Sequence, residues 1–69
     1  MTTADVLNEI ARERLRQDER WGEQNHDPLR WLAILVEEVG EVGKAILDRE
    51  GLREELVQVA AVAVAAIES

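Results

Sequence analysis

A run of nine apolar residues near the C-terminal end of the chain, residues 59–67, constrains the fold more than any other feature. Its valines would permit a strand, but the alternating alanines and the length of the segment favour a helix. A helix that is apolar on every side cannot lie on the surface of a three-helix monomer, because it has no face suited to water. We therefore expect its free side to pack against another subunit.

The length of the chain, 69 residues, allows one small domain that spans residues 1–69. A domain of this size buries only about 60% of the surface of its extended chain, so its core is marginal without further help. The sequence has no cysteine, which excludes disulfides and cysteine-ligated zinc. A bound metal, tight helix packing or self-association could add stability, and we expect self-association.

Start and stop signals divide the chain into three helices. The first is predicted to begin near Thr2 or Thr3 as N-cap and to end at about Arg20. The run of mostly charged residues between Glu9 and Arg20 is typical of a solvated helix face.

Asp27 followed by Pro28 is a strong start signal for a second helix, which is predicted to run to about Asp48. Gly51 is expected to adopt a left-handed conformation in the turn that follows. The third helix is predicted from about residue 52 to 67, so the short connection makes helices two and three an antiparallel hairpin. The predicted fold is all-α, an antiparallel bundle of about three helices completed by oligomerisation.

The charge balance limits the partners of the chain. Fifteen acidic and eight basic residues give a formal net charge of −7, which argues against a nucleic-acid duplex or an anionic membrane surface as partner. The longest apolar stretch is about half the length of a membrane span, and the N-terminal residues lack the pattern of a signal peptide. We expect a soluble cytoplasmic protein without a membrane partner.

Acidic residues interrupt the apolar side of the predicted second helix. At about 100° per residue one apolar stripe is formed by Trp31, Ile34, Leu35, Val39, Val42, Ala45 and Ile46. Glu38 falls in the middle of this stripe and Glu41 at its edge, while Glu55 falls inside the apolar face of the third helix. A carboxylate that points toward a core is costly unless a partner compensates its charge.

A divalent cation is the partner that best suits these carboxylates. All candidate ligands are oxygen atoms, which favour Mg²⁺, with Mn²⁺ as a substitute, over zinc or copper. Mg²⁺ commonly completes its coordination with water and substrate phosphates, so the pattern indicates metal-assisted chemistry on a phosphate-bearing ligand. The alternative is that these glutamates are ordinary solvated helix charges.

Three segments, in this order, resemble the MazG-like all-α NTP pyrophosphatase superfamily. Its signature is EExxE followed on the next helix by ExxD, and Glu37-Glu38-Val39-Gly40-Glu41 matches the first half. The segment Glu55-Leu56-Val57-Gln58 occupies the second half, with Gln58 at the aspartate position. Residues 13–17 and 21–26 are similar to the ERxRQ…WGxQxH stretch of a small MazG-like subgroup.

The resemblance implies hydrolysis of a (deoxy)nucleoside triphosphate to the monophosphate and pyrophosphate, as in nucleotide-pool sanitation. It implies that Glu38, Glu41 and Glu55 bind Mg²⁺ and that Glu37 is a further ligand or orients the attacking water. Members of the superfamily work as homodimers or homotetramers, with helices of neighbouring subunits completing the site.

Gln58 is the main departure from the superfamily pattern. By its position Gln58 is a candidate metal ligand, since its side-chain carbonyl can coordinate a cation, but it brings no negative charge and cannot act as a general base. The alternative function is therefore a non-catalytic helical assembly or binding module derived from such an enzyme, with a weakened metal site.

Aromatic and basic residues complete the candidate substrate site. Trp21 could stack on a nucleobase or simply seal the end of the bundle. His26 is expected to form hydrogen bonds within the loop, although it could also contact a base edge or a phosphate. Lys44 and Arg53 could meet a triphosphate or form surface ion pairs. Trp31 is expected to pack in the core.

Overall fold

The computed structural model describes residues 1–69 as three α-helices with no strand: α1 (Thr3–Trp21), α2 (Pro28–Asp48) and α3 (Leu52–Glu68). The all-α prediction is confirmed, and each predicted helix lies within one residue of its observed bounds. The strand alternative for residues 59–67 is excluded, because this segment is helical throughout.

Local capping interactions explain where the first two helices begin. Thr2 and Asp5 form a reciprocal capping box, in which each side chain accepts a hydrogen bond from the backbone N–H of the other, at 3.1 and 3.0 Å. The carboxylate of Asp27 accepts a hydrogen bond from the backbone N–H of Arg30 at 2.9 Å, and Pro28 follows at the first helical position. The predicted start signals are confirmed in both places.

The turn between α2 and α3 uses two left-handed residues. Gly51 has φ 78° as predicted, and Arg49, which ends α2, has φ 57°. An L-residue pays about 1–2 kcal/mol for this conformation, so the tight hairpin costs some stability at Arg49. No sequence signal pointed to Arg49, because arginine is not a typical C-cap residue.

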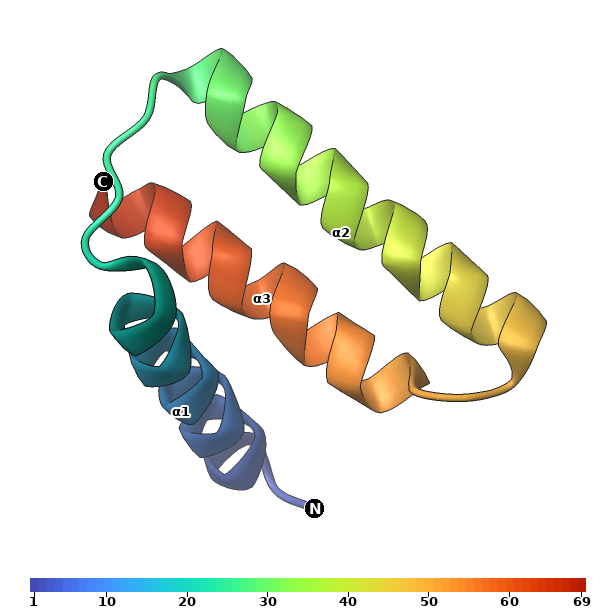
Figure 1. Cartoon of the computed structure of the whole chain (residues 1–69). Coiled ribbons are helices and arrows are strands. Elements are labelled where there is room, and N and C mark those ends of the chain that lie inside the picture. The colour runs from blue at the N-terminus through green and yellow to red at the C-terminus, as the bar shows by residue number, and fades with distance from the viewer.

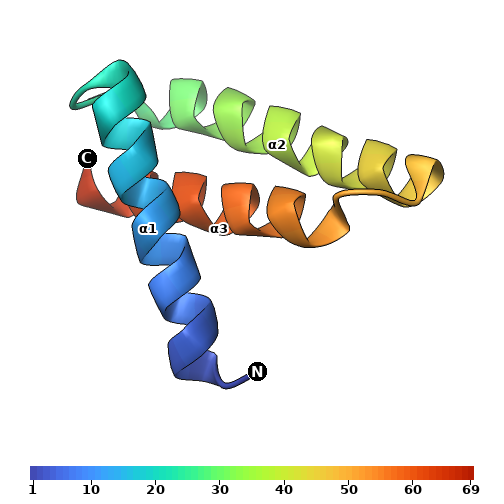
Figure 2. The same ribbon diagram turned by 60° about the horizontal axis from the view of Figure 1, so that its bottom comes forward.

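The third helix lies between the other two in Figure 1, and α1 crosses it at a steep angle in Figure 2. Both α1 and α2 pack on α3, and no Cα atom of α1 lies within 8 Å of a Cα atom of α2. This arrangement explains the apolar composition of α3, since two of its sides face protein. The core is small and consists of Trp31, Ala45, Val57, Ala61 and Val62. The prediction that Trp31 packs in the core is confirmed, with 9% of the residue exposed.

The apolar stripe of α2 is wider than one neighbouring helix can cover. Trp31 and Ala45 are buried against α3, whereas Val39 and Ile46, which were expected on the same buried stripe, are exposed. The free apolar surface was expected on α3, but it is most extensive on α2. None of the three helices has the length and hydropathy needed to cross a membrane.

Candidate functional site

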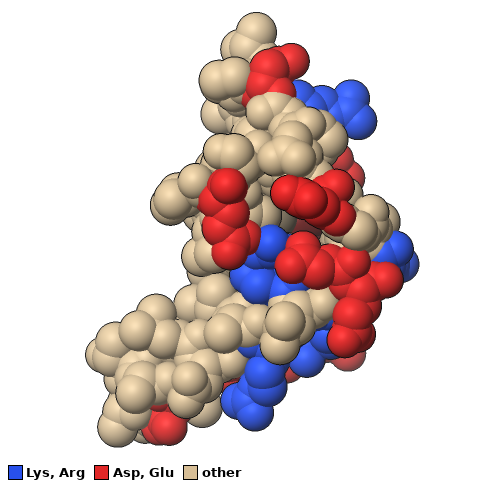
Figure 3. Space-filling view, turned by 90° about the vertical axis from the view of Figure 1, so that its left-hand side faces the viewer, with Lys and Arg blue, Asp and Glu red and all other residues tan.

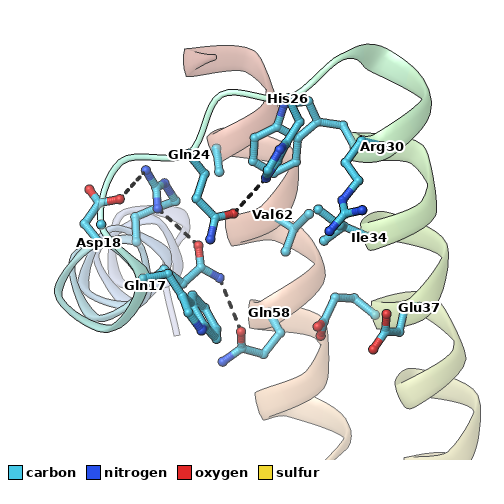
Figure 4. A pocket seen from close by; sticks show the side chains of 15 residues that line it. Gln17, Asp18, Gln24, His26, Arg30, Ile34, Glu37, Gln58 and Val62 are labelled. Atoms are coloured by element: carbon cyan, nitrogen blue, oxygen red, sulfur yellow. Dashed lines mark hydrogen bonds and ion pairs between the residues drawn. The ribbon is translucent and has the colours of Figure 1, made fainter.

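A gap between α1 and α2, with α3 as its floor, contains two adjoining depressions. The first, here called the loop cleft, has a volume of about 310 Å³, at the lower end of the range of small-molecule sites. It is lined by residues of all three helices and of the loop 22–27, including Gln24, His26, Arg30, Trp31 and Val62 (Figure 4).

The second depression, here called the acidic cleft, continues from the first along the helices. Its lining includes six glutamates, namely Glu13, Glu19, Glu37, Glu38, Glu41 and Glu55. The two clefts share Gln17, Trp21, Glu37, Glu38 and Gln58. A ligand could therefore occupy both, with one end in the loop cleft and the other above the glutamates.

Glu38 is the electrostatic centre of the acidic cleft. Partial burial raises the pKa of Glu38, because a carboxylate loses hydration there, and the negative charges of Glu55, Glu37, Glu41 and Glu13 raise it further. These neighbours come from all three helices. The structure thus brings the predicted residues Glu37, Glu38, Glu41 and Glu55 to one cleft and adds Glu13.

The carboxylates share a cleft but do not form a closed coordination shell. Glu38 and Glu55 are half-buried, while Glu37 and Glu41 are exposed. No group of three or more acidic, histidine or cysteine side chains is arranged closely enough to hold a metal ion in this conformation. Binding a cation would require the glutamate side chains to swing inward from their present rotamers.

A chain of hydrogen bonds connects α1 to Gln58. The guanidinium of Arg14 donates to Gln17 Oε1 at 3.1 Å, and Gln17 Nε2 donates to Gln58 Oε1 at 3.3 Å (Figure 4). Arg14 is held in turn by Asp18 at 3.1 Å and by Glu68 at 2.6 Å. Figure 3 shows basic and acidic side chains next to one another near the centre of this face of the molecule.

The donor-only chemistry of arginine fixes the orientation of both amides. Because a guanidinium cannot accept a hydrogen bond, Gln17 must turn its carbonyl oxygen to Arg14 and its NH₂ group to Gln58. Gln58 must then present its carbonyl oxygen to Gln17. The oxygen that was predicted to bind a metal therefore already accepts a hydrogen bond, while the NH₂ group of Gln58 has no partner within the chain.

The predicted aromatic and histidine residues line the clefts. Trp21 lines both clefts and is 55% exposed, with the guanidinium of Arg20 at 5.0 Å from its ring centroid. His26 Nε2 is hydrogen-bonded to Gln24 Oε1 at 3.2 Å, and the imidazole meets the Trp31 ring edge-on at 5.0 Å. The indole N–H of Trp31 is buried without a hydrogen-bond partner.

The two basic candidates lie outside the clefts that contain the glutamates. Lys44 is exposed and lines neither the loop cleft nor the acidic cleft. Arg53 forms an ion pair with Glu9 at 2.7 Å, on the α1–α3 side of the molecule. Of the two readings for Arg53, the structure therefore shows the surface ion pair.

Sequence reasoning missed the contribution of α1 to the site. Gln17 is the only buried polar residue, and Glu13 faces the same cleft, yet both lie in a charged run that is typical of a solvated face. The signal that could have found them is spacing, because Glu13 and Gln17 are four residues apart and share one helix face.

Comparison of the chain with known protein families, with curated proteins and with solved structures gave no match. The MazG-like resemblance therefore rests on the sequence motifs.

The raised pKa of Glu38 predicts a pH dependence of stability. Between the ordinary glutamate value of 4.5 and the raised value, the folded chain holds the proton of Glu38 more tightly than the unfolded chain. The free energy of unfolding is therefore expected to fall as pH rises through this window. Without metal, Glu38→Gln is expected to be more stable than the wild type at pH 7 and equally stable below pH 4.5, as measured by urea unfolding.

The control for this experiment is Glu50→Gln, which changes an exposed glutamate in the α2–α3 turn. Its unfolding free energy should follow that of the wild type at every pH. A Glu38→Gln chain that is less stable than the wild type at pH 7 would contradict the electrostatic account of this side chain.

The hydrogen-bond chain through Gln17 predicts a local stability cost. Gln17→Met keeps the length of the side chain but removes the part-buried hydrogen bonds that join it to Arg14 and to Gln58. We expect a loss of about 1–3 kcal/mol in the free energy of unfolding. Gln24→Met is the matched control, because it removes one part-buried hydrogen bond to His26, and equal losses in the two variants would argue against a special role of Gln17.

Proposed function

We propose that this chain is a Mg²⁺-dependent nucleoside triphosphate pyrophosphohydrolase that converts a (d)NTP and water into the (d)NMP and pyrophosphate. The observation that carries the proposal is the cluster of glutamates from three helices around Glu38, next to a cleft of small-molecule size. The MazG-like sequence motifs on the same residues support it independently.

The mutual repulsion of the glutamates favours the binding of a cation in the acidic cleft. Ionised carboxylates that raise the pKa of a neighbour destabilise one another, and a divalent cation removes this penalty. Glu38, Glu41 and Glu55 are the proposed ligands, and long glutamate side chains on neighbouring helices can converge on an ion. When bound, Mg²⁺ would neutralise phosphate charge and polarise the attacked phosphorus.

The loop cleft suits the nucleoside end of such a substrate. Trp21 offers a flat exposed ring for stacking, and His26, Gln24 and Arg30 offer polar groups at the cleft wall. Glu37 borders both clefts, and its proposed role is to orient a water toward the α–β anhydride. Hydrolysis breaks one P–O bond of that anhydride, and the water oxygen takes its place on phosphorus.

The proposal includes a role in nucleotide-pool sanitation in the cytoplasm, with the chain acting as a homodimer or homotetramer. No duplex nucleic acid or membrane takes part in the proposed reaction, in keeping with the net charge of −7.

One observation favours a second candidate function, a non-catalytic helical assembly or binding module. The carbonyl oxygen of Gln58 accepts the hydrogen bond of Gln17, so it is less available to a metal than the aspartate of the superfamily would be. A weakened metal site is the expected consequence.

The proposed activity predicts pyrophosphate release from at least one member of a panel of NTPs and dNTPs in the presence of Mg²⁺. Glu38→Gln should lower kcat/KM by at least about a hundredfold, since even outer-shell partners of metal ligands cost about 10–100-fold. Glu50→Gln serves as control for a general loss of acidic charge. No release with Mg²⁺ or Mn²⁺ from a folded chain would leave the assembly module as the function.

The identity of residue 58 predicts how strongly the site holds its cation. Gln58→Asp adds a carboxylate to the acidic cleft and should tighten Mg²⁺ binding about tenfold, which adds ~1.4 kcal/mol of stability at saturating Mg²⁺. The measurement is the rise of Tm with Mg²⁺ concentration. Gln58→Leu, which removes the amide without adding charge, is the control, and an equal rise in both variants would contradict a metal near residue 58.

A further inference from the structure

The side of α2 that faces away from α3 is a continuous apolar surface, here called the outer face of α2. Its residues recur at alternating spacings of three and four, typical of a helix that packs on another helix. They are Leu29, Leu32, Val36, Val39, Gly43 and Ile46, flanked by Ala33, Gly40 and Leu47. The six large side chains among them are 52–84% exposed, and no charged residue interrupts the surface.

The buried core of the molecule is too small to offset the free-energy cost of this exposed apolar surface. Only six of the 69 residues are buried, which is a marginal core for a chain without disulfides. A contiguous apolar patch on so small a protein marks a contact surface. An occupant of the outer face would need to be a long apolar surface itself, and a second copy of α2 provides one.

Two glycines on the outer face support a close approach of another helix. A Cβ atom added to Gly40 or Gly43 would meet nothing within 4 Å, so packing within the chain does not require either glycine. Each costs a helix interior about 1 kcal/mol relative to alanine. A glycine offsets this cost where a second backbone packs closely against it, because it has no Cβ atom in the way.

The charges beside the outer face are self-complementary in one orientation. Glu37 and Lys44 are seven residues apart, so they lie along the same edge of the face, and neither forms an ion pair within the chain. In an antiparallel pair of α2 helices that cross near Gly40, Glu37 lies level with Lys44 of the partner subunit. A twofold axis repeats this contact, which gives two ion pairs.

We propose that two copies of this chain form a twofold dimer through the outer faces of their α2 helices, antiparallel and crossing near Gly40. The dimer brings Lys44 of the partner subunit to Glu37, at the α2 wall of the acidic cleft. There its ammonium group can meet a phosphate of the ligand, a role that rests on the proposed function, whereas the dimer itself does not. Within its own chain, Lys44 lines neither cleft.

Sedimentation of the full chain tests the dimer without reference to activity. The wild type should sediment as a dimer at micromolar concentration, and Val36→Glu should raise its dissociation constant at least about a hundredfold, because the change buries charge at the centre of the contact. Leu15→Glu, on α1, is the matched control, since Leu15 is 63% and Val36 59% exposed. A monomeric wild type at 100-fold higher concentration, or equal effects of both changes, would overturn the proposal.

Charge reversal tests the antiparallel register. Glu37→Lys and Lys44→Glu should each raise the dissociation constant about tenfold, because each turns two attractive contacts into repulsive ones. The double variant restores opposite charges across the axis and should dimerise like the wild type. A double variant that is weaker than both single variants would overturn this register.

Mixing two inactive variants tests whether Lys44 acts across the dimer. Glu38→Gln lacks a working acidic cleft but keeps Lys44, and Lys44→Ala has the opposite defect. Equal amounts should recover about a quarter of the wild-type sites, since half of the dimers would be mixed and each would hold one complete site. A mixture no more active than its components would place Lys44 within its own chain. Failure of the wild type itself to hydrolyse would instead concern the proposed function.

Discussion

The packing of α3 against both other helices is the interaction on which the rest of the structure depends. The Cα atoms of α1 and α2 do not come within 8 Å of one another, so the packing that holds both helices in place is the packing on α3. The apolar composition of residues 59–67 is what allows one short helix to serve two neighbours at once. The clefts exist for the same reason, because two helices that share a neighbour without meeting leave a gap between them.

The location of the acidic residues follows from this geometry. Glu38 and Glu55 sit on helix sides that are otherwise apolar, where α2 and α3 face one another, and Glu13 reaches the same region from α1. Partial burial and like charge both oppose ionisation there. Replacing Glu38 is expected to stabilise a chain that binds no cation, so the cost of this residue supports the proposed binding of a cation. The amide of Gln58 lowers the total charge in the cleft by one relative to the superfamily pattern.

The helices could be predicted from the sequence almost to the residue, because their limits are set by local interactions. Thr2, Asp27, Pro28 and Gly51 act on the backbone within three or four residues, and the sequence displays such signals directly. The predicted glutamates also reached one cleft, since the hairpin between α2 and α3 is short. The spacing of Glu13 and Gln17 places them on one helix face, but it does not say that this face meets the cleft, because that depends on the side of α3 that α1 occupies. Nor could periodicity decide which part of the broad apolar stripe of α2 would be covered, and Val39 and Ile46 proved exposed.

The attachment of α1 by a single surface has a consequence for how the clefts would respond to a ligand. One wall of each cleft belongs to α1 and the opposite wall to α2. The loop 22–27 joins the two walls at one end, and the packing of each helix on α3 sets the distance between them elsewhere. A ligand that touches both walls would connect α1 directly to α2 across the cleft. Affinity and rigidity of the whole domain are thereby coupled, and each bound molecule would act as the missing contact between the first helix and the second.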